Sequence, residues 1–230
     1  MFPDPQAAAD LLTFASRAVR LGDGTVRLRA DGGVLVTTAA PLAPRGLLDA
    51  TPTVLGLRVS AIDPELPVTG RPEPAMPELE CDLVVEAAAL LPAPDDAQAV
   101  VLPDTATSPA WAGISPPRGG WEQKDAIDAA VLASRAQYGV AAVADALPEN
   151  AGEDVVRVVR GQVWGQPDEA LGGLPLGTAF AAFALGFIAG GEEAVVRTSG
   201  SWTRVTLARG HVLVRGPVRS GLTPVRSTGA

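Results

Sequence analysis

The chain has very few of the side chains that most catalytic and metal sites require. Its 230 residues include one histidine, His211, and one cysteine, Cys81. A Ser–His or Cys–His nucleophile would therefore have to use His211, and no Gly-x-Ser-x-Gly turn surrounds any serine. The metal-binding spacings Cys-x-x-Cys and His-x-x-x-His cannot be formed at all. We therefore predict no catalytic residue, no metal site and no cofactor.

The shortage of cysteine also bears on the compartment. A single cysteine cannot form an intramolecular disulfide, and a reducing compartment is the simplest setting for such a chain. The first six residues, Met-Phe-Pro-Asp-Pro-Gln, lack the basic and apolar regions of a signal peptide. The sequence therefore predicts a cytoplasmic protein.

Negative charge is missing from the end of the chain. The net charge is −8, yet no acidic residue follows Glu193. Six arginines lie beyond it: Arg197, Arg204, Arg209, Arg215, Arg219 and Arg226. The acidic total argues against a surface devoted to nucleic acid. The basic end either docks on the acidic remainder or meets an anionic partner.

Only one stretch is long and apolar enough to be tested as a membrane span. Residues 170–191 carry no charge over 22 positions, and about 20 residues are enough to cross a bilayer. Three glycines and a proline interrupt its first third, and glutamates flank it without a Lys or Arg anchor. We predict a buried core helix, and no membrane association.

The first hundred residues predict one helix on an antiparallel sheet of about five strands. Prolines start a helix over residues 5–21, and Asp31-Gly32-Gly33 is typical of a hairpin turn. Val26 and Leu28 alternate with Arg27 and Arg29, which indicates a strand with one buried and one wet face. The expected strands cover residues 25–29, 34–38, 53–62, 83–85 and 97–102.

The second half predicts three helices and then three strands. The helices are expected at residues 121–147, 155–164 and within 174–191, and the strands at 194–199, 202–207 and 211–215. Between the halves lies a segment rich in proline and glycine. We therefore divide the chain into an N-terminal α+β lobe (1–105), a linker loop (106–120) and a C-terminal helical lobe ending in a β-hairpin and basic tail (121–230).

A helix followed by a hairpin occurs twice, at an offset of 168 residues. This offset places Leu28 beside Val196 and Gly32 beside Gly200, although few aligned residues are identical. The predicted fold class is α+β, with two helix-plus-antiparallel-sheet lobes that a remote duplication could relate.

Two nucleic-acid or nucleotide patterns fail at the residue level. Residues 172–178 have the outline of a phosphate-binding loop, but Thr178 stands where the lysine is required. Three helices and a hairpin also follow the element order of a winged-helix domain. Its third helix would have to contact bases, yet residues 179–187 contain no hydrogen-bonding side chain. The sequence argues against DNA binding.

The best candidate site is the loop from Trp111 to Trp121, which covers the end of the linker and the residue after it. Trp111, Ile114, Arg118 and Trp121 combine aromatic, apolar and cationic side chains with stiffening prolines, which is typical of an interaction surface. The same composition would suit a loop that buries its own tryptophans between the lobes.

Three functions follow from these observations. The first is a non-enzymatic protein that binds an unknown protein partner through this loop, helped by the basic C-terminal face. The alternative is a small-ligand-binding protein or enzyme that uses Asp, Glu and Arg groups in an interlobe pocket. The third is a homo-oligomer formed through exposed hairpin edges.

Overall fold

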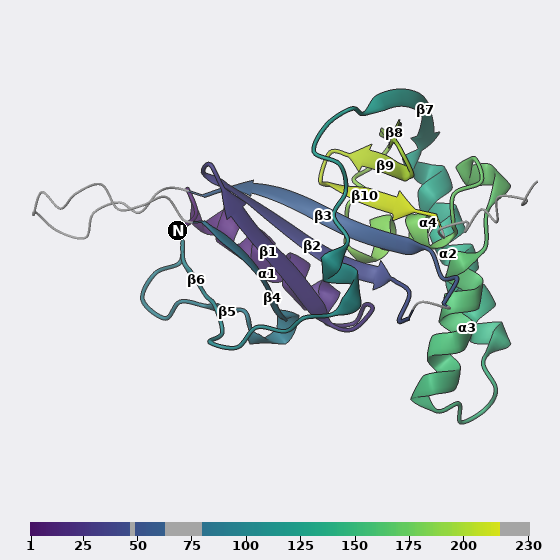
Figure 1. The fold of residues 1–230 in the computed structure, drawn as a ribbon, viewed down its shortest axis with the longest axis horizontal. Coiled ribbons are helices and arrows are strands. Elements are labelled where there is room, and N and C mark those ends of the chain that lie inside the picture. Colours follow the sequence, from purple (N-terminus) through teal and green to yellow (C-terminus); the bar gives the residue numbers. More distant parts are fainter. Residues whose placement is uncertain (47–48, 63–79, 217–230) are drawn as a thin grey trace, which may run out of the picture.

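The computed structural model describes residues 1–46, 49–62 and 80–216 (Figure 1). Its helices are α1 (Pro5–Ala18), α2 (Ala129–Ala146), α3 (Glu153–Gly165) and α4 (Gly177–Ala184), with short 3-10 turns η1 (Ala87–Ala89), η2 (Ala110–Gly113) and η3 (Glu169–Leu171). These helices pack on an antiparallel sheet, so the predicted α+β class is confirmed.

Eight strands form one continuous sheet in the order β4-β1-β2-β3-β10-β9-β8-β7. They are β1 (Thr25–Asp31), β2 (Val34–Leu42), β3 (Thr53–Ala61), β4 (Cys81–Glu86), β7 (Glu122–Asp128), β8 (Glu193–Ser199), β9 (Trp202–Leu207) and β10 (Gly210–Arg215). All the pairings between them are antiparallel. A separate two-stranded sheet joins β5 (Leu91–Pro92) to β6 (Val100–Val101).

Local sequence signals explain where α1 and the first hairpin form. The side chain of Asp4 accepts a hydrogen bond of 2.8 Å from the backbone N–H of Ala7, and Pro5 supplies the preset φ of a first helical position. The β1–β2 turn has φ values of 60° at Gly32 and 72° at Gly33, which favour glycine. The elements predicted at these two places are confirmed.

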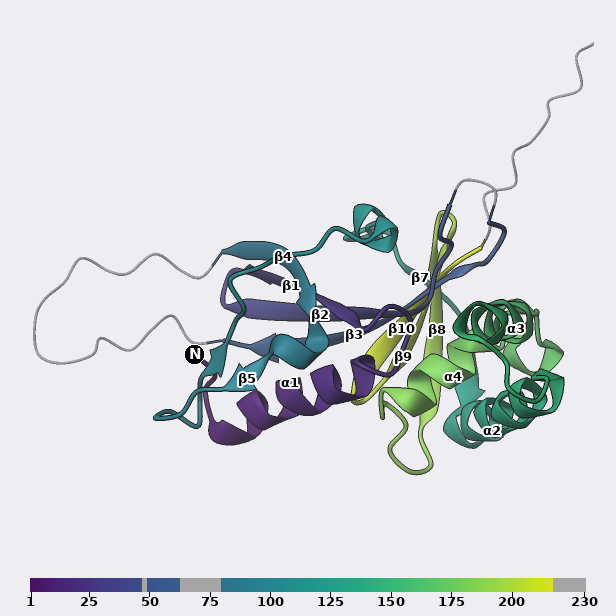
Figure 2. The ribbon, with the colours of Figure 1, turned by 90° about the horizontal axis from the view of Figure 1, so that it is seen from below.

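The sheet buries one face under helices and leaves the other partly open. Alternate strand residues such as Val26, Val54, Val205 and Val212 join the large core with α1, α2 and α4. Their neighbours in sequence point to the opposite face, because side chains alternate along a strand. Figure 2 shows α1 and α4 on one side of the sheet and the segment containing η2 on the other.

The two halves of the sheet repeat one arrangement. The strands β1 and β8 lie 168 positions apart at both ends, and the turns after them place Gly32 and Gly200 at φ values of 60° and 56°. Reading outward from the centre, β3, β2 and β1 on one side match β10, β9 and β8 on the other. The offset recognised in the sequence therefore matches equivalent elements in the fold.

The segment after α4 packs where the two halves meet. Phe187 is fully buried and lies parallel to Phe14 of α1, with 6.2 Å between ring centroids. Arg17 of α1 also donates a hydrogen bond of 2.8 Å to the carbonyl oxygen of Leu185. Glycines on the central strands make room for this segment: a Cβ on Gly56 would lie 1.9 Å from Leu185, and one on Gly210 would lie 2.4 Å from Phe187.

The helix predicted at residues 121–147 is wrong over its first two turns. Residues 122–128 form the edge strand β7, and α2 begins only after Asp128, whose side chain caps Ala130. Apart from Ile127, this stretch has no apolar side chain larger than alanine and is mostly exposed. Its strand structure comes from pairing with β8, a partner some 70 residues away in sequence.

The apolar stretch at residues 174–191 is helical only over the eight residues of α4. Gly186 takes a φ of 72°, and the N–H of Phe187 bonds back to the carbonyl of Ala182 at 2.9 Å, which closes the helix. Within the described ranges, no helix has the length and hydropathy needed to cross a bilayer. The strand expected at residues 97–102 is reduced to β6, outside the main sheet.

We predict that Gly210→Ala destabilises the protein by about 1–3 kcal/mol, because the new methyl group would overpack the buried Phe187 ring. Urea unfolding of the wild type and the variant measures this free energy. Gly113→Ala is the matched control, since nothing lies within 4 Å of a Cβ at that position. Equal stabilities for wild type and Gly210→Ala would contradict the packing described.

Candidate functional site: a cationic groove on the open sheet face

A second, smaller apolar cluster holds the linker against the open face of the sheet. It joins strand residues to the linker tryptophan: Ala40, Leu55, Val84, Trp111, Trp202 and Leu213. The indole N–H of Trp111 donates a hydrogen bond of 2.9 Å to Asp23, and only 4% of this residue is exposed. Trp111 thus anchors η2 to the sheet and fixes where the rest of the linker runs.

Cross-strand register places apolar and cationic side chains in a row beside this anchor. Arg27 faces Thr38 across the β1–β2 pair, Thr38 faces Leu57 on β3, and Leu57 faces His211 on β10. A parallel row runs from Arg29 through Val36 to Val59. Residues directly opposite in antiparallel strands share a face. These rows form the floor of a groove of about 290 Å³.

The linker forms one wall of this cationic groove. Ser115, Pro116, Pro117, Arg118 and Trp121 all line it. The indole N–H of Trp121 donates to the carbonyl oxygen of Pro117 at 3.2 Å, which closes the loop on itself. The guanidinium of Arg204, from β9, lies 4.5 Å from the centre of the Trp121 ring. This cation–π contact joins the linker to the basic C-terminal part of the chain.

An ion pair fixes the end of the groove at β1. Arg27 holds Asp82 of β4 through two hydrogen bonds of 2.6 and 2.7 Å, and it also donates to the carbonyl oxygen of Ala112 at 2.8 Å. The hydrogen bonds from Arg27 lower the pKa of Asp82, and the charges of Arg27 and Arg29 lower it further. The Asp82 carboxylate therefore pairs with Arg27. Arg29 lies opposite Asp82 in the β1–β4 pair but makes no ion pair with any described residue.

Two like charges lie at the other end, on β8 and β9, near His211 of β10. Arg197 lies directly opposite Arg204, a pairing that costs stability because the charges repel. Burial lowers the pKa of Arg204, and the charge of Arg197 lowers it further. The Nε of Arg204 is buried and makes no hydrogen bond with any residue that the structure describes. His211 bonds to the hydroxyl of Thr206 at 3.2 Å, and burial, then Arg204 and Arg197, lower its pKa.

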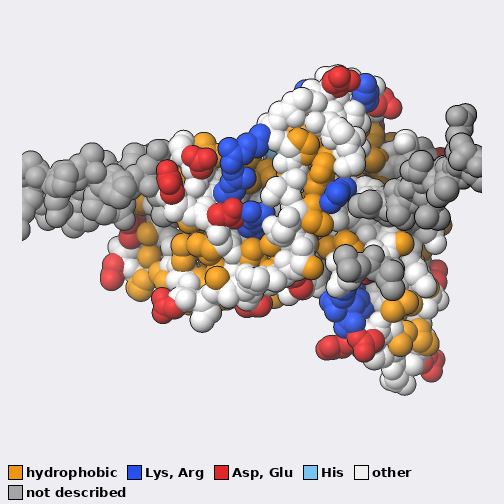
Figure 3. Space-filling view, viewed as in Figure 1, with side chains coloured by type: hydrophobic (Ala, Val, Ile, Leu, Met, Phe, Trp, Pro, Cys, Tyr) orange, Lys and Arg blue, Asp and Glu red, His pale blue; other side chains and the backbone are white. Residues whose placement is uncertain are grey.

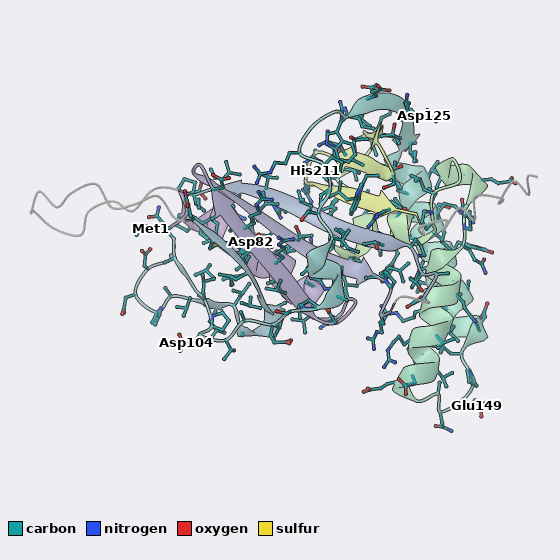
Figure 4. The ribbon with its side chains drawn as sticks, viewed as in Figure 1. Met1, Asp82, Asp104, Asp125, Glu149 and His211 are labelled. Carbon is teal, nitrogen blue, oxygen red and sulfur yellow. The ribbon has the colours of Figure 1, made fainter. Side chains whose placement is uncertain are left out.

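The groove therefore carries unneutralised positive charge beside apolar surface. None of the described residues that line it is acidic, and of its arginines Arg29, Arg118 and Arg204 take part in none of the ion pairs found among the described residues. Figure 3 shows Lys and Arg side chains beside an apolar patch over the middle of the sheet. In Figure 4, Asp82 and His211 lie on either side of strands β1, β2 and β3.

A larger cleft of about 780 Å³ lies between α3 and the end of β2, on the other side of Trp111. Arg45, Arg157, Arg160, Asp23 and Glu153 supply its charged lining. Several of these groups already have partners: Asp23 bonds Thr25 and the Trp111 indole, and Arg157 pairs with Asp154. It is the feature that corresponds to the interlobe pocket of the alternative hypothesis.

The four candidate residues predicted from the sequence have different surroundings. Trp111 is buried, and Ile114 is half-buried against the same small cluster. Arg118 is exposed and Trp121 half-buried, and both line the groove. Their role in binding stays a prediction.

Sequence reasoning missed the part of the groove that the sheet contributes. Arg27 and Arg29 were expected only to face water, and His211 only to sit in a strand. The signal was the alternation of arginine with apolar residues in β1. That pattern shows that two arginines share a face but does not show which other strands complete it.

Two family models match the chain in succession. Residues 1–113 match "Domain of unknown function (DUF8010)", and residues 116–219 match "Domain of unknown function (DUF8185)". The junction between them falls inside the predicted linker at residues 106–120, although the division into lobes stays a prediction. No curated protein matches the chain.

Among solved structures, the chain is similar to bacterial sliding clamps. The DnaN sliding clamp (DNA polymerase III subunit beta) from Bartonella birtlesii is 12% identical, with a TM-score of 0.47 over 92% of this chain and 64% of that one. The Caulobacter crescentus pol III beta is 15% identical, with a TM-score of 0.40 and the same coverage. The chain thus spans 64% of the length of these two proteins. No functional conclusion follows from similarity this low.

We predict that Trp111 and Arg118 differ sharply in their effect on folding. Trp111→Ala should cost about 3–5 kcal/mol of unfolding free energy, because it empties a buried site. Arg118→Ala should change that free energy by less than about 0.5 kcal/mol, because the side chain is exposed. Chemical denaturation of both variants tests this, and a nearly unchanged Trp111→Ala would show that the linker is not anchored as described.

We also predict a stability loss in acid that depends on His211. Its folded-state pKa lies below the ordinary value of 6.5, so below about pH 6.5 the unfolded chain binds a proton that the folded protein does not. Above about pH 6.5, His211 causes no loss of unfolding free energy. As the pH drops from there towards the folded-state pKa, the unfolding free energy falls by at most about 1.4 kcal/mol per pH unit.

Unfolding free energies at pH 7.5 and 5.5 measure this contribution. His211→Gln cannot take up the proton, so it should lose less stability than the wild type over the same interval. An identical loss in the two proteins would contradict the assigned surroundings of His211.

Proposed function

We propose that this protein is a non-enzymatic binding protein and that a partner protein binds in the cationic groove. One observation carries this proposal: side chains from the linker and from the basic C-terminal part of the chain line the same groove. The sequence had marked these two segments separately. Aromatic and arginine side chains around an apolar centre are the composition of interface hot spots.

The energetic state of the groove supports a partner that is absent from the isolated chain. Arg197 and Arg204 face each other although the contact is repulsive. Val59 is 50% exposed on the floor. A partner with negative charge would relieve the repulsion between the two arginines, and its apolar side chains would cover the exposed floor. In the chain alone, neither the arginine pair nor the exposed valine stabilises the fold.

A second candidate is the binding of a small anionic ligand in the larger cleft, as the alternative hypothesis expects. Its volume of about 780 Å³ is within the range of ligand sites, and three arginines line it. The groove ranks higher, because Asp23 and Arg157 of the cleft already have polar partners of their own. In the groove only Arg27 is paired, with Asp82, while Arg29, Arg118 and Arg204 make no ion pair with any described residue.

Site-specific photo-crosslinking tests the proposed function. A benzoylphenylalanine at Val59, in the groove, should give a discrete protein adduct in cells that express the full chain. The same group at Val158, which is 57% exposed on α3 and does not line the groove, is the matched control. Adding Arg118→Ala to the Val59 variant should reduce the adduct severalfold without unfolding the protein.

The two candidates give different outcomes. An adduct at position 59 that Arg118→Ala weakens, and that is absent at position 158, supports the groove. No protein adduct at position 59 contradicts the proposal, and that is the result expected if the chain acts through a small ligand in the cleft.

A further inference from the structure

The length of the groove limits what can lie along it. It runs from the β1 arginines across β2, β3 and β10 to Arg204 on β9, which is four strand spacings. Neighbouring strands are about 4.8 Å apart, so the floor is roughly 19 Å long. An extended peptide rises about 3.3 Å per residue. About six extended residues would span the length of the floor.

The order of side chains along the floor defines a charge pattern. Arg27 and Arg29 stand at one end, and Arg204 and His211 stand towards the other. Apolar side chains occupy the middle, from adjacent strands: Val36, Leu57, Val59 and Leu213. Guanidinium groups at both ends and an apolar centre are complementary to a segment with the opposite arrangement.

The wall indicates how such a segment would be held. Pro116 and Pro117 have no backbone N–H, so this part of the linker cannot extend a β-ladder to the ligand. The floor is the face of the sheet and not its edge, so its backbone groups are already paired within the sheet. Recognition therefore depends on side chains, chiefly the arginines and the apolar floor.

We infer that the groove takes an extended acidic peptide segment of about six residues, with carboxylates at both ends and apolar side chains in the middle. This inference rests on the proposed function and specifies its partner. A single-stranded nucleic acid fits less well, because its sites need successive aromatic platforms. Among the described residues lining the groove, the only aromatic ring besides the His211 imidazole is that of Trp121, which already contacts Arg204.

Fluorescence polarisation with the full chain tests the inference. The probe is a fluorescein-labelled hexapeptide, Asp-Glu-Leu-Val-Glu-Asp. Its controls are Asn-Gln-Leu-Val-Gln-Asn, which removes the charge, Asp-Glu-Gly-Gly-Glu-Asp, which removes the apolar centre, and a six-nucleotide oligothymidylate. We expect the acidic peptide to bind at least about tenfold more tightly than each control and to weaken as salt screens the charges.

Protein variants locate the binding. Arg29→Gln and Arg204→Gln, at the two ends of the groove, should each weaken the acidic peptide about tenfold. Arg209→Gln is the matched control, because this arginine is exposed in the β9–β10 turn and does not line the groove. Unfolding curves of the three variants confirm that each one folds.

Each outcome supports or overturns the inference. The inference is overturned if the uncharged peptide Asn-Gln-Leu-Val-Gln-Asn binds as tightly as the acidic one, or if no peptide binds. It is also overturned if the oligothymidylate binds more tightly than the acidic peptide. The same holds if Arg209→Gln weakens binding as much as Arg204→Gln. A protein adduct at Val59 together with any of these results would preserve the proposed function and reject only the acidic segment. Absence of both the adduct and peptide binding would reject both.

Discussion

The pairing of β3 with β10 is the interaction on which the rest of the structure depends. It joins residues 53–57 to residues 211–215 and makes one eight-stranded sheet from two halves of the chain. The segment from Leu185 to Phe187 packs over this seam, in space left by Gly56 and Gly210. Arg17 of α1, from the first half, donates a hydrogen bond to the carbonyl oxygen of Leu185, the residue that follows α4 in the second half.

The β3–β10 pairing also creates the groove, because successive side chains along each strand point to opposite faces of the sheet. One set of alternate residues faces the helices and forms the core, and the other set faces the linker. Because the sheet is continuous, cationic residues from β1 and from β9 lie along one surface although more than 170 positions separate them in sequence. Trp111 then fixes the linker over this surface and gives the groove its wall. The candidate site is thus made by the same pairing that holds the halves together.

Much of the fold could be predicted from local pattern. The capping aspartate and Pro5 mark α1, the Asp31-Gly32-Gly33 turn marks the first hairpin, and the 168-residue offset identifies equivalent elements. The predictions failed where a long-range contact decides the structure. β7 has no strand pattern of its own and depends on β8, and the end of α4 depends on Gly186 and the packing around Phe187. For the site, Arg118 and Trp121 could be proposed from composition, but their neighbours on the sheet could not.

The sequence by itself determined which residues can share a strand face, where turns must form, and that positive charge is concentrated after Glu193. These are properties of neighbouring residues, set by backbone geometry and side-chain spacing. Only the tertiary structure decided that Trp111 is buried while Trp121 lines a groove, and that Arg29 and Arg204 stand at the ends of one apolar floor. The physical reason is that strand order and register depend on pairing between distant segments, and no local preference encodes which strand lies beside which.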